Sequence, residues 1–153
     1  MAFSVDHDKA AKGRYLPPEG EYETVIKAAR PNVTREGVPF LDFRLTIRED
    51  VAQAGQGETI RYAVWRRKTP AEFDLEGYPA GVVQSLLRCA GIQNGVRFES
   101  LQECLRCLSG LAIRVRVKHE EINGAIKARV CYILPPVFPL VLKAVGEDSE
   151  LPF

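Results

Sequence analysis

Apolar and polar residues alternate along three segments in the first half of the chain, which is the pattern of strands buried on one face only. The first segment, residues 21–29, ends before Pro31. The second, residues 40–48, alternates most regularly, and the third, residues 58–68, has Trp65 at a polar position. We therefore expect three strands that each turn one face to a core and the other to water.

The spacing of apolar residues becomes helical in the middle of the chain. An apolar stripe is entered through Pro79 and closed by Gly91, as is common at the two ends of a helix. A second, shorter helix is predicted from Ser100 to Gly110, because Ser100 and Glu103 match a capping box, in which each side chain satisfies the other's backbone N–H. One or two short helices are thus expected after the third strand.

Alternation returns in residues 111–118 and 125–133, which predict a fourth and a fifth strand. Asn123-Gly124, between them, is a strong signal for a two-residue hairpin turn. Strict alternation along the fifth strand places Tyr132 on its apolar face.

Three strands, a helical stretch and two strands follow one another in this order in the OB-fold, a small five-stranded barrel whose second and third strands bind oligonucleotides. A mixed α+β sheet with helices on one face is the competing architecture. We expect residues 1–134 to form the domain. Residues 135–145 are an apolar connection that either docks on the domain as an edge segment or makes a homodimer contact, and residues 146–153 form an acidic tail.

The strand positions expected to face water are strongly basic. They hold nine Lys or Arg residues and two aromatic residues against one acid, Asp42, although Glu or Thr would serve solubility equally well. The eleven residues are Phe40, Arg44, Arg48, Arg61, Trp65, Arg67, Arg114, Arg116, Lys118, Lys127 and Arg129.

Binding of single-stranded nucleic acid would explain this excess of basic residues. Lys and Arg neutralise phosphates and release counterions, and aromatic rings stack on unpaired bases. We therefore expect sequence-tolerant binding of single-stranded DNA, with Trp65 and Phe40 as stacking platforms. The alternative is that Trp65 covers a seam of the barrel and that the basic residues pair with acids on neighbouring strands. Those acids are Glu23, Glu58, Glu120 and Glu121.

The net charge of +1 conceals a basic body. Residues 146–153 carry three acids and no Lys or Arg, so the remaining 145 residues have 21 basic and 17 acidic side chains and a net charge of +4. No stretch is long and apolar enough to span a membrane, and the N-terminus lacks the regions of a signal peptide. We expect a cytoplasmic protein whose four cysteines are reduced.

The tail has acids at Glu147, Asp148 and Glu150 and ends in Leu151, Pro152 and Phe153. It resembles the C-terminal tip of bacterial single-stranded-DNA-binding proteins, with Leu where Ile is usual. The acids keep the tail solvated, the proline limits the entropy lost on docking, and a terminal Phe with its carboxylate suits an apolar pocket rimmed by Lys or Arg. The resemblance implies recruitment of a replication or recombination enzyme, and the free tail is also expected to compete weakly with DNA for the basic face.

The cysteines indicate little chemistry. Cys104 and Cys107 have the spacing of a metal or redox site, but they fall on a predicted helix among leucines, while Cys89 and Cys131 are isolated. We expect all four to be small hydrophobic residues in the interior.

No enzyme motif stands out. The sequence has no phosphate-binding Gly-rich loop with Lys, no nucleophile elbow and no zinc-peptidase motif. Asp42, Glu23 and Asp50 are candidates for a metal-dependent nuclease site, but alternation scatters them over different faces. We expect no catalytic residue, no metal and no cofactor.

Four ordered segments carry a second resemblance: residues 16–23, residues 43–48, residues 98–101, and residues 114–121 followed by Asn123-Gly124. They resemble a family of phage and mobile-element proteins catalogued as a domain of unknown function, whose members are commonly described as single-stranded-DNA-binding proteins. The resemblance implies a replication or recombination accessory protein and brings no catalytic residues. A protein-interaction adaptor and a nuclease subunit are the rival functions.

Overall fold

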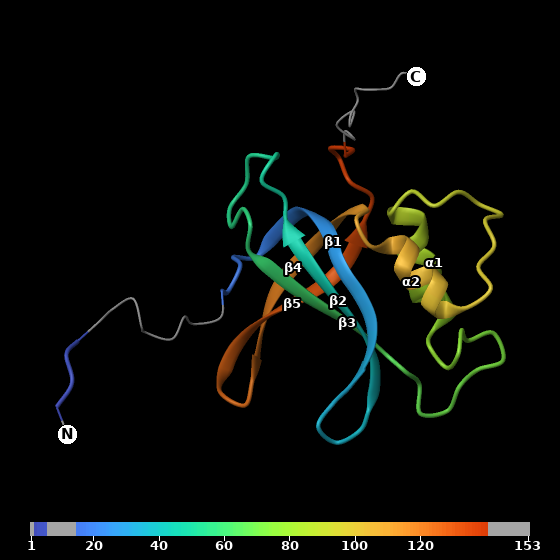
Figure 1. Cartoon of the computed structure of the whole chain (residues 1–153), viewed down its shortest axis with the longest axis horizontal. Coiled ribbons are helices and arrows are strands. Elements are labelled where there is room, and N and C mark those ends of the chain that lie inside the picture. The colour runs from blue at the N-terminus through green and yellow to red at the C-terminus, as the bar shows by residue number, and fades with distance from the viewer. Residues whose placement is uncertain (1, 6–14, 141–153) are drawn as a thin grey trace.

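The computed structural model describes residues 2–5 and 15–140 of the 153-residue chain. Five strands form one sheet, and two helices lie together beside it (Figure 1). The elements are β1 (Gly20–Val33), β2 (Pro39–Ile47), β3 (Thr59–Trp65), α1 (Ala80–Cys89), α2 (Leu101–Leu108), β4 (Ala112–Ile122) and β5 (Ala125–Leu134). The predicted mainly β class, with short helices between the third and fourth strands, is confirmed.

The strand order in the sheet is β3-β2-β1-β4-β5, and every neighbouring pair is antiparallel. The two edge strands, β3 and β5, come near each other. No backbone pairing joins these two strands in the part of the chain that the structure describes. The sheet is therefore curved but not closed, and the expected barrel is not confirmed.

β1 is longer than its alternation predicts, because it continues through Pro31 to Val33. Only the first part of β1, up to Val25, pairs with β4, so the rest has a neighbour on one side alone. Proline donates no hydrogen bond and is tolerated in a strand that has one free side. The expectation that Pro31 ends the strand is therefore wrong.

The N-terminus of α2 is capped largely as the sequence predicts. Ser100 Oγ accepts a hydrogen bond from the N–H of Glu103 at 3.1 Å. The Glu103 carboxylate accepts from the N–H of Glu99, at 2.7 Å, rather than from that of Ser100. Glu76, from the loop before α1, accepts from the N–H of Leu101 at 2.9 Å. Three backbone N–H groups at this end are therefore satisfied by side chains.

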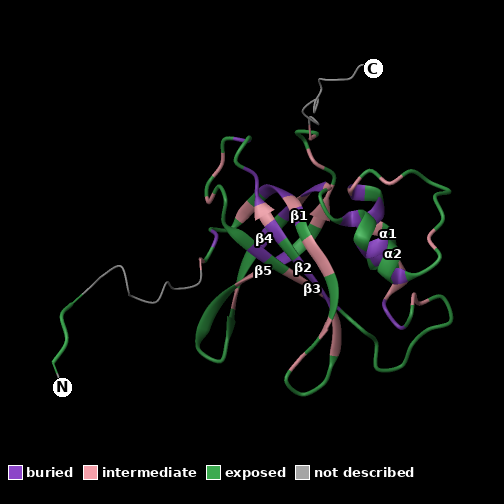
Figure 2. Cartoon of the chain, in the orientation of Figure 1, coloured by how far each residue is buried: buried purple, intermediate pink, exposed green. Residues whose placement is uncertain are grey.

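The core lies between one face of the sheet, here called the inner face, and the two helices (Figure 2). Helix α2 packs on β1, and α1 packs on β5. Burying a large apolar side chain contributes about 1.5–3 kcal/mol, so the inner face decides which side of each strand turns outward. The largest buried residues of the core, on the sheet and the helices together, include Ile26, Leu41, Phe43, Leu45, Leu86, Leu105, Leu108 and Ile113.

A β-bulge at Cys131 reverses the orientation of the end of β5. Arg116 of β4 lies opposite Tyr132, and the next residue, Val117, lies opposite Val130, so Cys131 is an extra residue in β5. Val130 is buried as a result, whereas Tyr132 is 60% exposed. The prediction that Tyr132 shares the apolar face of Val130 is wrong, because strict alternation makes no allowance for an inserted residue.

Candidate nucleic-acid interface

Two adjoining hollows, of about 760 and 840 Å³, lie along the gap between β3 and β5. The first is lined by residues 57–61 and 125–128, and the second by residues between 61 and 65 and by residues 127–131. The two edge strands therefore run in the same direction along the gap. We call the two hollows together the edge-strand groove.

Six of the eleven predicted binding residues line the edge-strand groove. They are Arg44, Arg61, Trp65, Lys118, Lys127 and Arg129. Two acids, Glu58 and Glu120, are found among the described lining residues. The groove is thus predominantly basic, and it brings together side chains from β2, β3, β4 and β5.

Trp65 and Phe40 form an aromatic pair beside the groove. They are opposite each other in the β2–β3 ladder, with ring centroids 4.9 Å apart and ring planes inclined by 37°. Trp65 remains 51% exposed, although an indole gains much from burial. The predicted exposure of Trp65 is confirmed, and Phe40 supports the ring without covering it.

The basic residues of the groove differ in how they are neutralised. Arg61 contacts the Asp42 carboxylate at 2.8 Å, and Arg129 contacts Glu120 at 3.2 Å. Asp42 was expected to face water, but it is 2% exposed. Three cations of the groove make no salt bridge with any residue that the structure describes: Arg44, Lys118 and Lys127.

Lys27 also lines the groove and lies on the polar side of the first strand's alternation, although it is not among the eleven predicted residues. The β1–β2 register shifts between Ile26 and Ala28, so Lys27 is an extra residue in β1. An inserted residue is left out of the ladder and can be aimed independently of its neighbours. Lys27 is exposed and forms no salt bridge with a described residue.

Arg48 was expected to face water at the end of the second strand, but it is buried. Its side chain is 2% exposed. Its Nε and Nη2 donate to the two carboxylate oxygens of Asp50 at 2.9 and 2.7 Å, and its Nη1 donates to the carbonyl of Phe138. This paired hydrogen bond raises the pKa of Arg48 and lowers the pKa of Asp50. Arg48 therefore holds the fold together and is not accessible to a ligand.

Residues 135–140, which we call the strap, cover the sheet at this point. The N–H of Val137 donates to the Glu23 carboxylate at 3.2 Å, and the carbonyl of Pro135 accepts from Arg114 Nε at 3.2 Å. Glu23 is 5% exposed, and its Oε1 has no hydrogen-bond partner among the described residues. The strap thus docks on the domain and seals a small cluster of buried charges.

Arg114 and Arg116 lie outside the groove. Arg114 is 24% exposed and forms salt bridges with Glu21 and Glu23. Arg116 is exposed on the opposite side of β4 from the core, where it lies across from Tyr132. Arg114 is therefore occupied by contacts within the domain, whereas Arg116 remains accessible to a ligand.

Arg67 was expected to extend the face of Trp65, but β3 ends at Trp65 rather than at residue 68. The N–H of Arg67 donates to the carbonyl of Gly77 at 2.9 Å, so the chain has already left β2. Its Nε contacts the Asp74 carboxylate at 2.9 Å. Arg67 therefore stabilises the loop before α1.

The three carboxylates considered for a nuclease site do not meet. Asp42 contacts Arg61, whereas Glu23 and Asp50 both adjoin Arg48. Within residues 2–5 and 15–140, no group of three or more His, Cys, Asp or Glu side chains is arranged to hold a metal ion. Each of the three acids is used to neutralise an arginine.

The cysteines divide into two kinds. All four are free thiols. Cys89 and Cys104 are buried as predicted, whereas Cys107 and Cys131 are exposed. Burial, with a smaller contribution from Cys107, raises the pKa of the Cys104 thiol, which disfavours its reactive thiolate.

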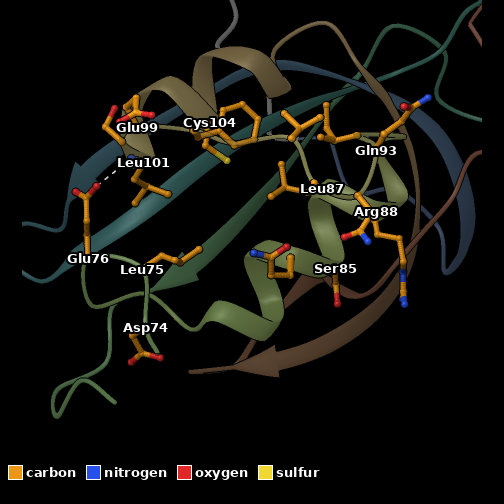
Figure 3. A pocket seen from close by; sticks show the side chains of 17 residues that line it. Asp74, Leu75, Glu76, Ser85, Leu87, Arg88, Gln93, Glu99, Leu101 and Cys104 are labelled. Carbon is orange, nitrogen blue, oxygen red and sulfur yellow. Dashed lines mark hydrogen bonds between the residues drawn. The ribbon is translucent and has the colours of Figure 1, made fainter. Parts of the chain in front are cut away.

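Another hollow, of about 700 Å³, lies between the helices and the loop that joins them (Figure 3). Its apolar wall includes Leu87, Leu101 and Cys104. The charged residues on its lining are three acids and one arginine: Asp74, Glu76, Glu99 and Arg88. This balance of charge does not suit a polyanion, so we do not count the hollow as part of the interface.

The proposed partner-binding tail lies outside the described residues, as do residues 141–145. Its predicted contacts are Glu147, Asp148, Glu150, Leu151, Pro152 and Phe153. In the described part of the chain, each helix is too short or too polar to cross a bilayer.

A family model described as a protein of unknown function, DUF669, matches residues 3–130. Among curated proteins, none matches the chain. The matched region contains all of β1 to β4, both helices and almost all of the edge-strand groove. It spans most of the 153 residues, and the chain therefore belongs to the DUF669 family.

Proposed function

We propose that this protein binds single-stranded DNA without strong sequence preference, that it is not an enzyme, and that the edge-strand groove is its binding surface. The observation that carries the proposal is a half-exposed indole, Trp65, beside cations that have no described counter-ion. A folded domain gains little by exposing both, whereas a flexible polyanion with unpaired bases uses both.

The groove suits a single strand better than a duplex. Bases of a single strand are free to reach Trp65, and each base stacked on an aromatic ring contributes about 1–3 kcal/mol. Phosphates lie along Arg44, Lys118 and Lys127, which release counterions when they are neutralised. Binding is consequently expected to weaken steeply as salt is added.

We assign the domain to the OB type, as a five-stranded barrel that is open between β3 and β5. The strand order, the antiparallel pairing and the position of the helices between β3 and β4 support this assignment. In OB-folds, the second and third strands carry oligonucleotides. Here β2 and β3 carry Arg44, Arg61 and Trp65.

We also propose that the protein serves DNA replication, recombination or repair, that it is encoded by a phage or mobile element, and that it acts in the cytoplasm of a bacterial host. Its acidic residues 146–153 recruit a partner enzyme through Leu151, Pro152 and Phe153. Deleting residues 146–153 tests whether the tail also competes with DNA. Higher affinity at low salt supports the competition, and unchanged affinity rules it out.

The decisive experiment is a fluorescence titration with oligo-dT, since Trp65 is the only tryptophan. We expect strong quenching that decreases as salt rises. Trp65→Ala, followed by anisotropy of a labelled oligonucleotide, should weaken binding by about 1–3 kcal/mol. Phe73→Ala is the matched control, because Phe73 is 79% exposed and lines neither hollow of the groove.

Two results would redirect the proposal. Absence of quenching and of any anisotropy change at low salt would favour an adaptor whose basic face binds an acidic protein. Cleavage of labelled single strands with Mg²⁺ or Mn²⁺, abolished by Asp42→Ala, would instead reveal a nuclease.

A further inference from the structure

Tyr132 is a second aromatic side chain that the fold leaves in solvent, next to the end of the groove rather than on its lining. Its side chain is 60% exposed, and its hydroxyl makes no hydrogen bond to a described residue. It follows directly after Cys131, the last β5 residue that lines the same hollow as Trp65. Because β3 and β5 run in the same direction along the groove, Tyr132 and Trp65 lie at the same end, on opposite edge strands.

The surroundings of Tyr132 are basic. Arg116 is its direct neighbour across the β4–β5 ladder, and the next outward pair along that ladder is Lys118 and Arg129. The carboxylate on the other side of Arg116, Glu21, contacts Arg114 instead. An aromatic ring with an accessible cation beside it is the same combination that Trp65 presents on β3.

We propose that Tyr132 is a second base-stacking platform, so that a bound single strand crosses the end of the groove with one base on Trp65 and another on Tyr132. Arg116 contacts the phosphate backbone beside it. This inference rests on the proposed function and adds to it a defined path, from β3 across the gap to β4 and β5. The aromatic ring of Tyr132, rather than its hydroxyl, is the group that contacts the base, because the hydroxyl makes no hydrogen bond to a described residue.

The test compares Tyr132→Ala and Tyr132→Phe by anisotropy, using labelled oligo-dT of increasing length and Phe73→Ala as the control. Tyr132→Ala should weaken binding about tenfold on oligonucleotides long enough to reach both platforms, and by less than about twofold on the shortest that still bind Trp65. Tyr132→Phe should bind like the wild type. Trp65 quenching at saturation should be unchanged in both variants, which a misfolded domain would not allow.

Equal affinity of Tyr132→Ala and wild type at every length would overturn the inference while leaving the groove intact. So would an equal loss in Tyr132→Phe, because it would assign the effect to the hydroxyl. A wild type that does not bind oligo-dT at all would instead defeat the proposed function itself. Arg116→Ala gives an independent reading, since it should lower the slope of log affinity against log salt by about one.

Discussion

Arg44 and Arg48 lie in the same segment of chain, and alternation assigns both to its polar side, yet Arg44 is exposed and Arg48 is buried. Arg44 lines the edge-strand groove and has no described counter-ion. Arg48 lies beneath the strap and bonds Asp50. Alternation thus assigns a residue to one side of a strand, but a segment ninety residues away along the chain decides whether that side is open.

The largest effect on stability is expected from replacing Arg48, the buried arginine of the two. Arg48→Ala leaves the buried Glu23 carboxylate with Arg114 as its one remaining described cation and the Phe138 carbonyl without its donor. Removing one partner of a buried charge pair typically costs about 3 kcal/mol or more. We expect a loss of about 3 kcal/mol in the free energy of unfolding, measured by urea denaturation.

Arg44→Ala is the control for that loss and should change the free energy of unfolding by no more than about 0.5 kcal/mol. If the two variants are equally stable, the strap does not depend on Arg48. The contrast drawn between the covered and the open part of the sheet would then be wrong.

An intermediate effect, on DNA affinity, is expected from replacing basic residues of the edge-strand groove. Arg44→Ala and Lys127→Ala should each weaken DNA binding at low salt and lower the slope of log affinity against log salt by about one. Each removes one proposed phosphate contact without disturbing a described ion pair. Titrations at four or five salt concentrations measure the slope.

Arg67→Ala provides the matched comparison for those slopes, because Arg67 contacts Asp74 in the loop beyond β3. It should leave the slope unchanged. A decrease as large as that of Lys127→Ala would mean that bound DNA extends past the groove to this loop.

The smallest effect concerns Asp50, whose pKa is lowered by the hydrogen bond from Arg48. A lowered pKa in the folded state means that the ionised carboxylate stabilises the fold at any pH above its unfolded value of about 3.9. That stabilisation is lost as the pH falls through the lower, folded value. The difference in unfolding free energy between wild type and Asp50→Asn should therefore be constant near pH 6 and shrink below about pH 4.

Urea denaturation at several pH values measures this difference. Because the Asp50 side chain is 59% exposed, solvent screens much of the interaction, and the effect should be well below that of Arg48→Ala. A difference that grew on acidification would contradict the proposed pairing.

Local periodicity predicted the elements of this fold well. The two-residue period of β2 and the helical stripe before Gly91 each reflect one buried face, and both elements formed where expected. Trp65 could be predicted as exposed for the same reason, since its neighbours Ile60 and Val64 occupy the inner face of β3. These are short-range signals, and they need no knowledge of distant contacts.

The errors that matter for the binding surface depend on information that alternation does not carry. Arg48 is covered by the strap, which no local pattern reveals, and Arg67 lies past the end of β3, where it bonds the loop before α1. Tyr132 owes its position to a bulge, which depends on how one strand pairs with the next. Whether β3 and β5 pair likewise depends on the curvature of the whole sheet, which no single residue determines.

The extra residue at Cys131 has an evolutionary consequence. Deleting its codon would leave Tyr132 opposite Arg116 and Val130 opposite Val117, since adjacent residues of a regular strand face opposite sides of the sheet. The bulge thus absorbs a one-codon insertion in an edge strand, and the side chains before and after it keep their faces. Relatives that lack this codon would be expected to keep the position of Val130 in the core and that of Tyr132 in solvent.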